Sequence, residues 1–238
     1  MFKLDRRRQV AELMDDPQVP VGNHHQALRG LSRINWFSNS SGILFKPIQQ
    51  IAQSHPGHQL TLLDIATGGG DVVIRLKNKC ERLGIPIKFS ATDISQTALD
   101  MAAKKPGAKG IHWFQHNIIN DGILQNYDIV ISSLFIHHLE EEELHVVLQR
   151  FREIARKAIL INDLRRCVCG WWAAKIIPRF LSRSRIVHFD GPVSVAGAFT
   201  SEELLHYARQ AGWEGAKVQH VFPWRMLLEW HTPKLEAA

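Results

Sequence analysis

Two patterns of apolar residues alternate along the chain. The first is a short, continuous apolar run bounded by polar or turn-forming residues, which is typical of a strand buried on both faces of a sheet. Such runs occupy residues 62–65, 87–92, 111–115, 127–133 and 158–162. The sequence therefore predicts a sheet built from these segments.

The second pattern is apolar residues three and four positions apart, the spacing of one helix face. It follows the first run in residues 72–83 and returns after the later runs, where four consecutive glutamates at 140–143 favour a helix N-terminus. Strands that alternate regularly with helices predict an α/β fold. We expect a three-layer, Rossmann-like, mostly parallel sheet with helices on both faces.

The N-terminal part of the chain departs from this alternation. Residues 1–55 are expected to form a helical arm and cover, because helical spacing of apolar residues occurs at 27–34 and again at 44–51. The serines and glycine at 40–42 are expected to separate these two helices. The domain that contains the sheet is then expected over residues 56–238.

A second departure comes after the fifth predicted strand. Residues 164–199 contain aromatic residues, prolines and a basic Ser-Arg-Ser-Arg segment, and we interpret them as an insertion. Thr200 and Glu203 have the spacing of a capping box and predict the start of the last helix. Two short apolar segments at 218–222 and 226–230 predict a closing hairpin.

Composition narrows the class of protein. Of the 238 residues, 45% are hydrophobic and 22% are charged, which is ordinary for a globular protein, and no apolar run is long enough for a membrane span. Three cysteines are too few for a disulfide framework, and no secretory signal is evident, so we expect a cytoplasmic protein. The formal net charge of +6 permits nucleic-acid binding, but the excess charge is spread thinly and does not predict it.

The glycine-rich turn after the first predicted strand is the best candidate for a ligand site. Asp64 is followed by Thr67, Gly68, Gly69 and Gly70, and glycines let backbone N–H groups approach a ligand closely. A dinucleotide fingerprint needs one more glycine than this turn supplies, and a carboxylate at the strand end would repel a pyrophosphate. S-adenosylmethionine (SAM) carries no phosphate, and its cationic groups tolerate a carboxylate. A turn without a ligand is the remaining alternative.

Residues 62–72 resemble the first motif of class I SAM-dependent methyltransferases, with Ala66 in place of the first motif glycine. The form Asp-x-Ala-x-Gly-x-Gly-Asp is most similar to the ubiquinone/menaquinone C-methyltransferase-like branch of small-molecule enzymes. Residues 33–42 loosely resemble a Met-Asn-x-x-x-Ser-x-Gly segment of the same branch. The resemblance covers residues 60 to about 165. It implies a seven-stranded sheet, parallel except for one strand of the closing hairpin, with SAM at the carboxyl ends of the strands.

Further cofactor residues follow the later strands. Asp93 lies 23 positions beyond Gly70, close to the offset of about 20 at which an acidic residue accepts hydrogen bonds from ribose hydroxyls; a helix-start role is its alternative. The resemblance implies that Asn117 accepts from the adenine amino group, for which a turn asparagine is the alternative, while Ile118 packs on the ring. The residues expected to bind SAM are Asp64, Ala66, Thr67, Gly68, Gly70, Asp93, Ile94, Asn117, Ile118 and Ser133.

Methylation of a phenolic oxygen, whose intrinsic pKa is about 10, requires removal of a proton, and histidine is suited to take it near neutral pH. We predict His138, after the fourth strand, as this base and His188 in the insertion as the second candidate; loop or capping roles are the alternatives. Adjacent side chains diverge, so only one of His137 and His138 is expected to face the pocket. We assign His137, Arg165 and Arg166 to the acceptor, with solvated arginines left open. No metal is expected, because serines stand where catechol-type enzymes bind magnesium.

Together these observations predict a SAM-dependent methyltransferase that acts on a small aromatic molecule: a phenol, a quinol or a polyketide hydroxyl. Residues 160–166 and 190–195 are similar to segments of methyltransferases from bacterial polyketide or quinone-like pathways. Carbon methylation of a quinol ring is the close alternative. The next alternatives are an RNA methyltransferase and a non-catalytic binding protein with the SAM fold. The sequence leaves the acceptor, the methylated atom and the oligomeric state open.

Overall fold

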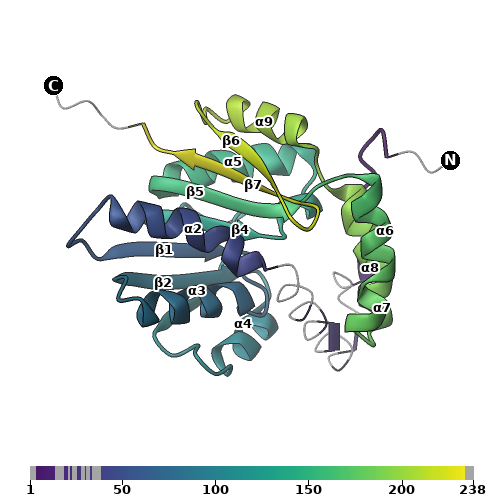
Figure 1. Cartoon of the computed structure of the whole chain (residues 1–238), viewed down its shortest axis with the longest axis horizontal. Helices are drawn as coiled ribbons and strands as arrows, with labels where there is room; N and C mark the ends of the chain where they lie inside the picture. The colour runs from purple at the N-terminus through teal and green to yellow at the C-terminus, as the bar shows by residue number, and fades with distance from the viewer. Residues whose placement is uncertain are drawn as a thin grey trace.

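The computed structural model describes residues 4–13, 19, 20, 22, 26, 27, 30, 33 and 39–233. Most of the first predicted helix, and residues 34–38 of the segment that resembles the quinone branch, lie outside the described residues. The described chain contains a seven-stranded sheet with helices on both faces (Figure 1). This arrangement confirms the predicted three-layer α/β fold.

The strand order is β3-β2-β1-β4-β5-β7-β6, with β1 to β5 parallel to one another. Among the described strands, β7 is the one that runs opposite to the others, since it pairs antiparallel with both β5 and β6. This confirms that one strand of the closing hairpin runs against the rest. The strands are β1 (Leu60–Ile65), β2 (Ile87–Asp93), β3 (Ile111–Gln115), β4 (Tyr127–Ser133), β5 (Ala155–Leu164), β6 (Lys217–Val221) and β7 (Arg225–His231).

The central strands are apolar on both faces because helices cover both. On one face, Leu62 of β1 and Ile129 of β4 pack with α2 (Ser40–Gln53) and α3 (Asp71–Arg82). On the other face, their neighbours in the strands pack against α5 (Glu141–Ile154) and α9 (Ser201–Gln210). Alternate residues of each strand therefore belong to opposite cores, as expected from the two-residue repeat of a strand.

Side-chain caps fix the starts of several helices. Ser95 accepts from the backbone N–H of Ala98 at the start of α4 (Gln96–Ala103), and Thr200 and Glu203 form the predicted capping box of α9. A second capping box joins Glu140 to Glu143 at the start of α5. The expected break at residues 40–42 is wrong, because α2 begins at Ser40 and these residues form its first turn.

The insertion after β5 consists of three helices, α6 (Val168–Ile176), α7 (Pro178–Leu181) and α8 (Arg185–Gly197). They form a separate stack beside the sheet (Figure 1). The N-terminal arm contacts this stack, since the backbone N–H of Arg8 donates to the carbonyl of Ala196 at 3.0 Å. Within the part of the chain that the structure describes, every helix is too short or too polar to cross a membrane.

Candidate active site

The glycine turn connects β1 to α3 at the carboxyl end of the sheet, and its backbone takes left-handed conformations at Ala66 (φ 58°), Gly68 (φ 53°) and Gly70 (φ 73°). A Cβ at Gly70 would lie 2.6 Å from Cη2 of Trp113, so this position packs too tightly for any side chain. A Cβ at Gly68 would meet no described atom within 4 Å. Trp113 thus packs against the turn at Gly70, whereas the space beside Gly68 is open. This open space lets a ligand approach the backbone closely.

Asp64 lies in β1 beneath this turn, with only 1% of its surface exposed. Its Oδ2 accepts a hydrogen bond of 2.6 Å from the Thr67 hydroxyl, whereas its Oδ1 has no partner among the described residues. Burial raises the pKa of Asp64 to about 7, although the bond from Thr67 acts in the opposite direction. A buried carboxylate oxygen without a partner favours a ligand that brings a donor or a positive charge.

Asp93 joins the end of β2 to the glycine turn. One carboxylate oxygen accepts from the backbone N–H of Gly68 at 2.7 Å, and the other accepts from the N–H of Ser95 at 2.9 Å. Because Ser95 caps α4, the alternative role of Asp93 as that helix's cap is not observed. Asp93 therefore lies at the carboxyl end of β2 beside the glycine turn, the place expected for a carboxylate that binds ribose hydroxyls.

The other residues assigned to SAM lie at neighbouring strand ends. Ile94 is 63% exposed, and Ile118 is buried against the core. The side-chain oxygen of Asn117 accepts from the backbone N–H groups of residues 119 and 120, which is the turn role left open from the sequence. Ser133 ends β4, and its hydroxyl accepts from the amide of Asn162 at 2.9 Å. The adenine contact of Asn117 remains a prediction.

The chain after β4 forms a short 3₁₀ helix, η2 (Ile136–His138), that places two imidazoles together. The ring centroids of His137 and His138 are 4.2 Å apart, and both residues line the same pocket. The expectation that only one of them faces the pocket is therefore wrong. A 3₁₀ turn is tighter than the extended backbone for which adjacent side chains diverge.

A buried carboxylate from β5 holds this turn in place. Asp163 Oδ1 lies 2.6 Å from Nδ1 of His137, and Oδ2 accepts from the backbone N–H groups of Phe135 and Ile136 at 3.1 and 2.9 Å. Burial alone would raise the pKa of Asp163, but the imidazole of His137 and the hydrogen bonds lower it below its ordinary value. An ionised Asp163 fixes the Nδ1–H tautomer of His137 and directs its Nε2 towards the pocket.

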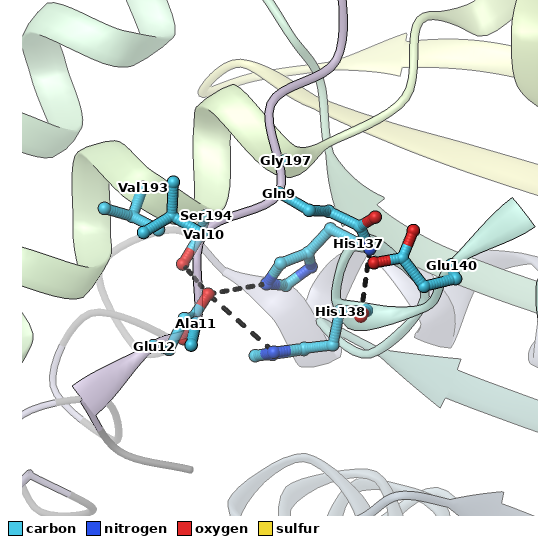
Figure 2. Close-up of a pocket in the computed structure, with 10 residues that line it drawn as sticks. All are labelled: Gln9, Val10, Ala11, Glu12, His137, His138, Glu140, Val193, Ser194 and Gly197. Atoms are coloured by element: carbon cyan, nitrogen blue, oxygen red, sulfur yellow. Dashed lines mark hydrogen bonds and ion pairs between the residues drawn. The ribbon is translucent and has the colours of Figure 1, made fainter. Parts of the chain in front are cut away.

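The pocket beside these histidines has a volume of about 240 Å³ and lies between η2, α8 and the N-terminal arm (Figure 2). Glu12 of the arm points into it, with Oε1 3.8 Å from Nε2 of His137 and 3.8 Å from Nδ1 of His138. The hydroxyl of Ser194 on α8 bonds to the same oxygen. The rest of the lining mixes apolar residues, such as Val10 and Val193, with the polar side chains of Gln9 and Glu140.

Three predicted site residues lie elsewhere. Arg166 is buried and makes a two-pronged ion pair with Glu203 at 2.6 and 3.0 Å, which leaves its guanidinium little capacity to hold an acceptor. Arg165 contacts Nδ1 of His220 on β6 at 2.9 Å. His188 on α8 bonds to the carbonyl of Ser182 at 2.8 Å and does not line the pocket of the two histidines.

Sequence reasoning assigned no role to Glu12, Ser194 or Lys105. The ammonium group of Lys105 bonds to the carbonyl of Gly69 at 2.8 Å and to Asp71 at 2.9 Å, so it steadies the glycine turn. No local pattern marks these residues, because each reaches its partner across a long stretch of sequence. Asp163 was noticeable as a strand-end carboxylate beside a pair of histidines, and that signal could have identified it.

The chain is similar in sequence and in fold to known methyltransferases and to a polyketide synthase. A family model described as a methyltransferase domain matches residues 62–158, which run from β1 into β5. The chain is also 29% identical, over 132 residues, to the non-reducing polyketide synthase atr1 of Stereocaulon alpinum. That match covers 49% of this chain and 5% of the synthase.

Two solved structures share the fold. The carbon methyltransferase DszA superimposes with a TM-score of 0.62 at 11% identity, covering 82% of this chain and 54% of that one. Magnesium protoporphyrin IX methyltransferase (ChlM) from Synechocystis PCC 6803, with bound S-adenosylhomocysteine (SAH), superimposes with a TM-score of 0.57 at 15% identity, covering 91% and 89%. This chain thus spans a small part of the synthase and about half of the DszA structure.

Proposed function

We propose that this chain is a class I SAM-dependent methyltransferase that methylates a hydroxyl group of a small aromatic acceptor; a family model described as a methyltransferase domain matches residues 62–158. SAM is the cofactor of that domain and, when bound, supplies an activated methyl group. One observation carries the proposal. The strand ends that bear the cofactor residues continue directly into a turn with two histidines, which face a small pocket together with Glu12.

The residues at the strand ends fit SAM. The unpartnered Oδ1 of Asp64 and the open space beside Gly68 suit the cationic end of the cofactor. The carboxylate of Asp93, beside the glycine turn, is the proposed acceptor for ribose hydroxyls, and the exposed side chain of Ile94 offers apolar surface to the adenine ring. A diphosphate would meet two carboxylates here, which disfavours a dinucleotide.

The size and chemistry of the pocket support a small acceptor. A volume of about 240 Å³, below the range of about 300–1,000 Å³ for drug-sized ligands, favours a small acceptor over a nucleic-acid strand. A relative that is 29% identical over 132 residues is a polyketide synthase. Polyketides frequently carry phenolic hydroxyls, so we favour this class of acceptor.

The histidines supply what hydroxyl methylation needs from the protein. Attack on a sulfonium methyl group is an in-line displacement, so alignment and exclusion of water contribute much of the acceleration. The acceptor hydroxyl must also lose its proton. Asp163 holds His137 with its second nitrogen facing the pocket, and His138 lies beside it. We propose that this pair takes the proton, with His138 as the more accessible member.

A product assay tests the proposal. The protein is incubated with SAM carrying an isotopically labelled methyl group and with phenols, quinols, phenolic polyketides and RNA. Mass spectrometry then identifies the labelled product, and NMR identifies the methylated atom. We expect labelled O-methyl product from a small phenol. Label on a ring carbon would favour the C-methyltransferase alternative, and label on RNA alone would contradict a small acceptor.

Histidine variants sharpen the same test. His137→Ala and His138→Ala are each expected to lower kcat by at least about 10²-fold, the range of general-base catalysis, with the affinity for SAH nearly unchanged. Glu142→Gln, on the exposed face of α5, is the matched surface control. Full activity in His138→Ala would contradict a base role for that residue.

A further inference from the structure

The N-terminal arm, residues 7–13, lies across the acceptor pocket and is bonded to both of its walls. On the η2 side, the guanidinium of Arg7 bonds to the carbonyls of His137 and Leu139 and lies 3.9 Å above the Phe199 ring. The amide of Gln9 donates to the carbonyl of Leu139 at 2.7 Å. The arm thus contacts the turn that carries the two histidines.

The other side of the arm is fixed to α8. The backbone N–H of Leu13 donates to Oδ1 of Asp190 at 2.8 Å, and the N–H of Arg8 donates to the carbonyl of Ala196 at 3.0 Å. Glu12 therefore enters the pocket from a segment that is held at both ends (Figure 2). Its position is set by the fold and not by a freely moving terminus.

The surroundings of the Glu12 carboxylate favour a cationic neighbour. Its side chain is 11% exposed, and its Oε1 faces the two imidazoles and the Ser194 hydroxyl. A carboxylate at this level of burial is costly unless donors or positive charge face it. An imidazole that has taken a proton from the acceptor supplies that charge at the moment of reaction.

We propose that Glu12 is a positioning residue, which stabilises the protonated histidine pair, and that the arm closes the acceptor pocket. This inference rests on the proposed function. The O–H bond of the acceptor breaks and an N–H bond forms on an imidazole. The acceptor oxygen then bonds to the methyl carbon as the carbon–sulfur bond breaks. The positive charge stays on the imidazole, where the Glu12 carboxylate stabilises it until the proton passes to solvent.

A divalent cation is the competing occupant of this cluster. Ligand atoms of Glu12, His137 and His138 lie within 4.8 Å of one another, and Asp163 supports His137 as a carboxylate often supports a zinc-bound histidine. However, Zn–N and Zn–O distances of about 2.0–2.1 Å place tetrahedral ligands about 3.3 Å apart. The separations from Glu12 Oε1 to the two imidazole nitrogens are 3.8 Å, and Ser194 donates to that same oxygen. We therefore favour the proton role.

Other charged groups around His137 and His138 also influence whether the two imidazoles are protonated. Asp163 faces His137 from β5, and Glu140 lines the pocket at the start of α5. Asp190 lies on α8 and bonds to the arm, while the Arg7 guanidinium bonds to the backbone of η2 and not to the rings. The carboxylates of Asp163 and Glu12 face the imidazoles directly, while the buried guanidinium of Arg225 on β7 interacts with Asp163. Removal of one carboxylate should favour the neutral rings.

The test compares Glu12→Gln with the surface control Glu142→Gln. We expect Glu12→Gln to lower kcat about 10-fold, with KM and the Kd of SAH within about twofold of wild type. The reason is that Glu12 stabilises the imidazolium, which forms only during the reaction and not when the acceptor or SAH binds. The acid limb of the kcat/KM profile should move to lower pH by roughly 0.5–1 unit, since a neighbouring negative charge favours the imidazolium. NMR titration of the His137 and His138 ring signals should show the same shift without acceptor. Glu12→Asp should give an intermediate shift.

Three results would overturn the inference. In the first, the His137 and His138 rings of Glu12→Gln titrate as in wild type and only the melting temperature falls. Glu12 would then have a structural role. Another is a wild-type protein that holds stoichiometric zinc, iron or manganese by elemental analysis and loses it in Glu12→Gln, which would make the cluster a metal site. The third is a KM effect without a kcat effect. The NMR titration needs no turnover, so it distinguishes failure of this inference from failure of the proposed methyl transfer.

Discussion

Asp64 has an environment that links the cofactor crevice to the stability of the fold. Its carboxyl group is buried in β1, and burial raises its pKa to about 7. In the unfolded chain the same group has a pKa of about 3.9. Its contribution to stability is therefore fully present below about pH 4, declines as the pH rises, and is lost above about pH 7, because the unfolded state releases the proton first.

Asp64→Asn removes this titration and keeps the shape of the side chain. At pH 8 we expect the variant to have a free energy of unfolding about 4 kcal/mol higher than wild type, and at pH 5 a smaller difference of roughly 1–2 kcal/mol. Urea denaturation at the two pH values measures it. An equal difference at both pH values would show that the carboxyl group does not titrate in this window.

The glycine turn shows how one element combines packing with binding. At Gly70 the backbone has φ 73° and a Cβ would clash with Trp113, so Gly70→Ala should destabilise the protein by about 2–4 kcal/mol. At Gly68 a Cβ would enter open space, so Gly68→Ala should cost only about 1–2 kcal/mol from its left-handed backbone. Its methyl group should nevertheless reduce the affinity for SAH at least about 10-fold.

Urea denaturation and SAH calorimetry on the two glycine variants separate these effects. We expect Gly70→Ala to lose more stability than Gly68→Ala. We expect Gly68→Ala to bind SAH more weakly although it stays folded. Gly68→Ala with normal SAH affinity would mean that the ligand does not occupy the space beside this residue.

Arg166 joins the end of β5 to the first turn of α9 through its ion pair with Glu203. Its guanidinium is buried, while its partner Glu203 is 38% exposed. Arg166→Ala leaves that carboxylate unpaired, and we expect a loss of about 2–3 kcal/mol, below the value for a fully buried pair because solvent screens Glu203. Thermal denaturation measures this loss. Unchanged stability with a raised acceptor KM would restore the acceptor role predicted from the sequence.

At the scale of the whole molecule, the sheet and its helices could be predicted because their signals are local. A run such as 127–133 and the capping box from Thr200 to Glu203 determine structure within a few residues. The cofactor end of the site could be predicted for the same reason. Parallel strands bring their carboxyl ends to one edge, so Asp64 and Asp93 had to lie near each other.

The acceptor end of the site depends on contacts between distant segments, and the sequence does not encode these as a local pattern. Glu12 reaches the histidines across more than 120 residues, and the insertion separates Arg166 from Glu203 in the sequence. Whether His137 and His138 diverge depended on a 3₁₀ turn that Asp163 stabilises from another strand. Tertiary hydrogen bonds of this kind determine the direction of a side chain, and local sequence patterns do not reveal them.

The most direct test of the account is calorimetric titration of the wild-type protein and Asp93→Ala with SAH and with NADH. Asp100→Ala, an exposed carboxylate on α4, is the control. We predict that wild type binds SAH and gives no heat with NADH. Loss of a charged hydrogen-bond partner should weaken SAH binding to Asp93→Ala about 10-fold or more, while Asp100→Ala binds like wild type. Binding of NADH in place of SAH, or equal SAH affinity in wild type and Asp93→Ala, would contradict the proposed crevice.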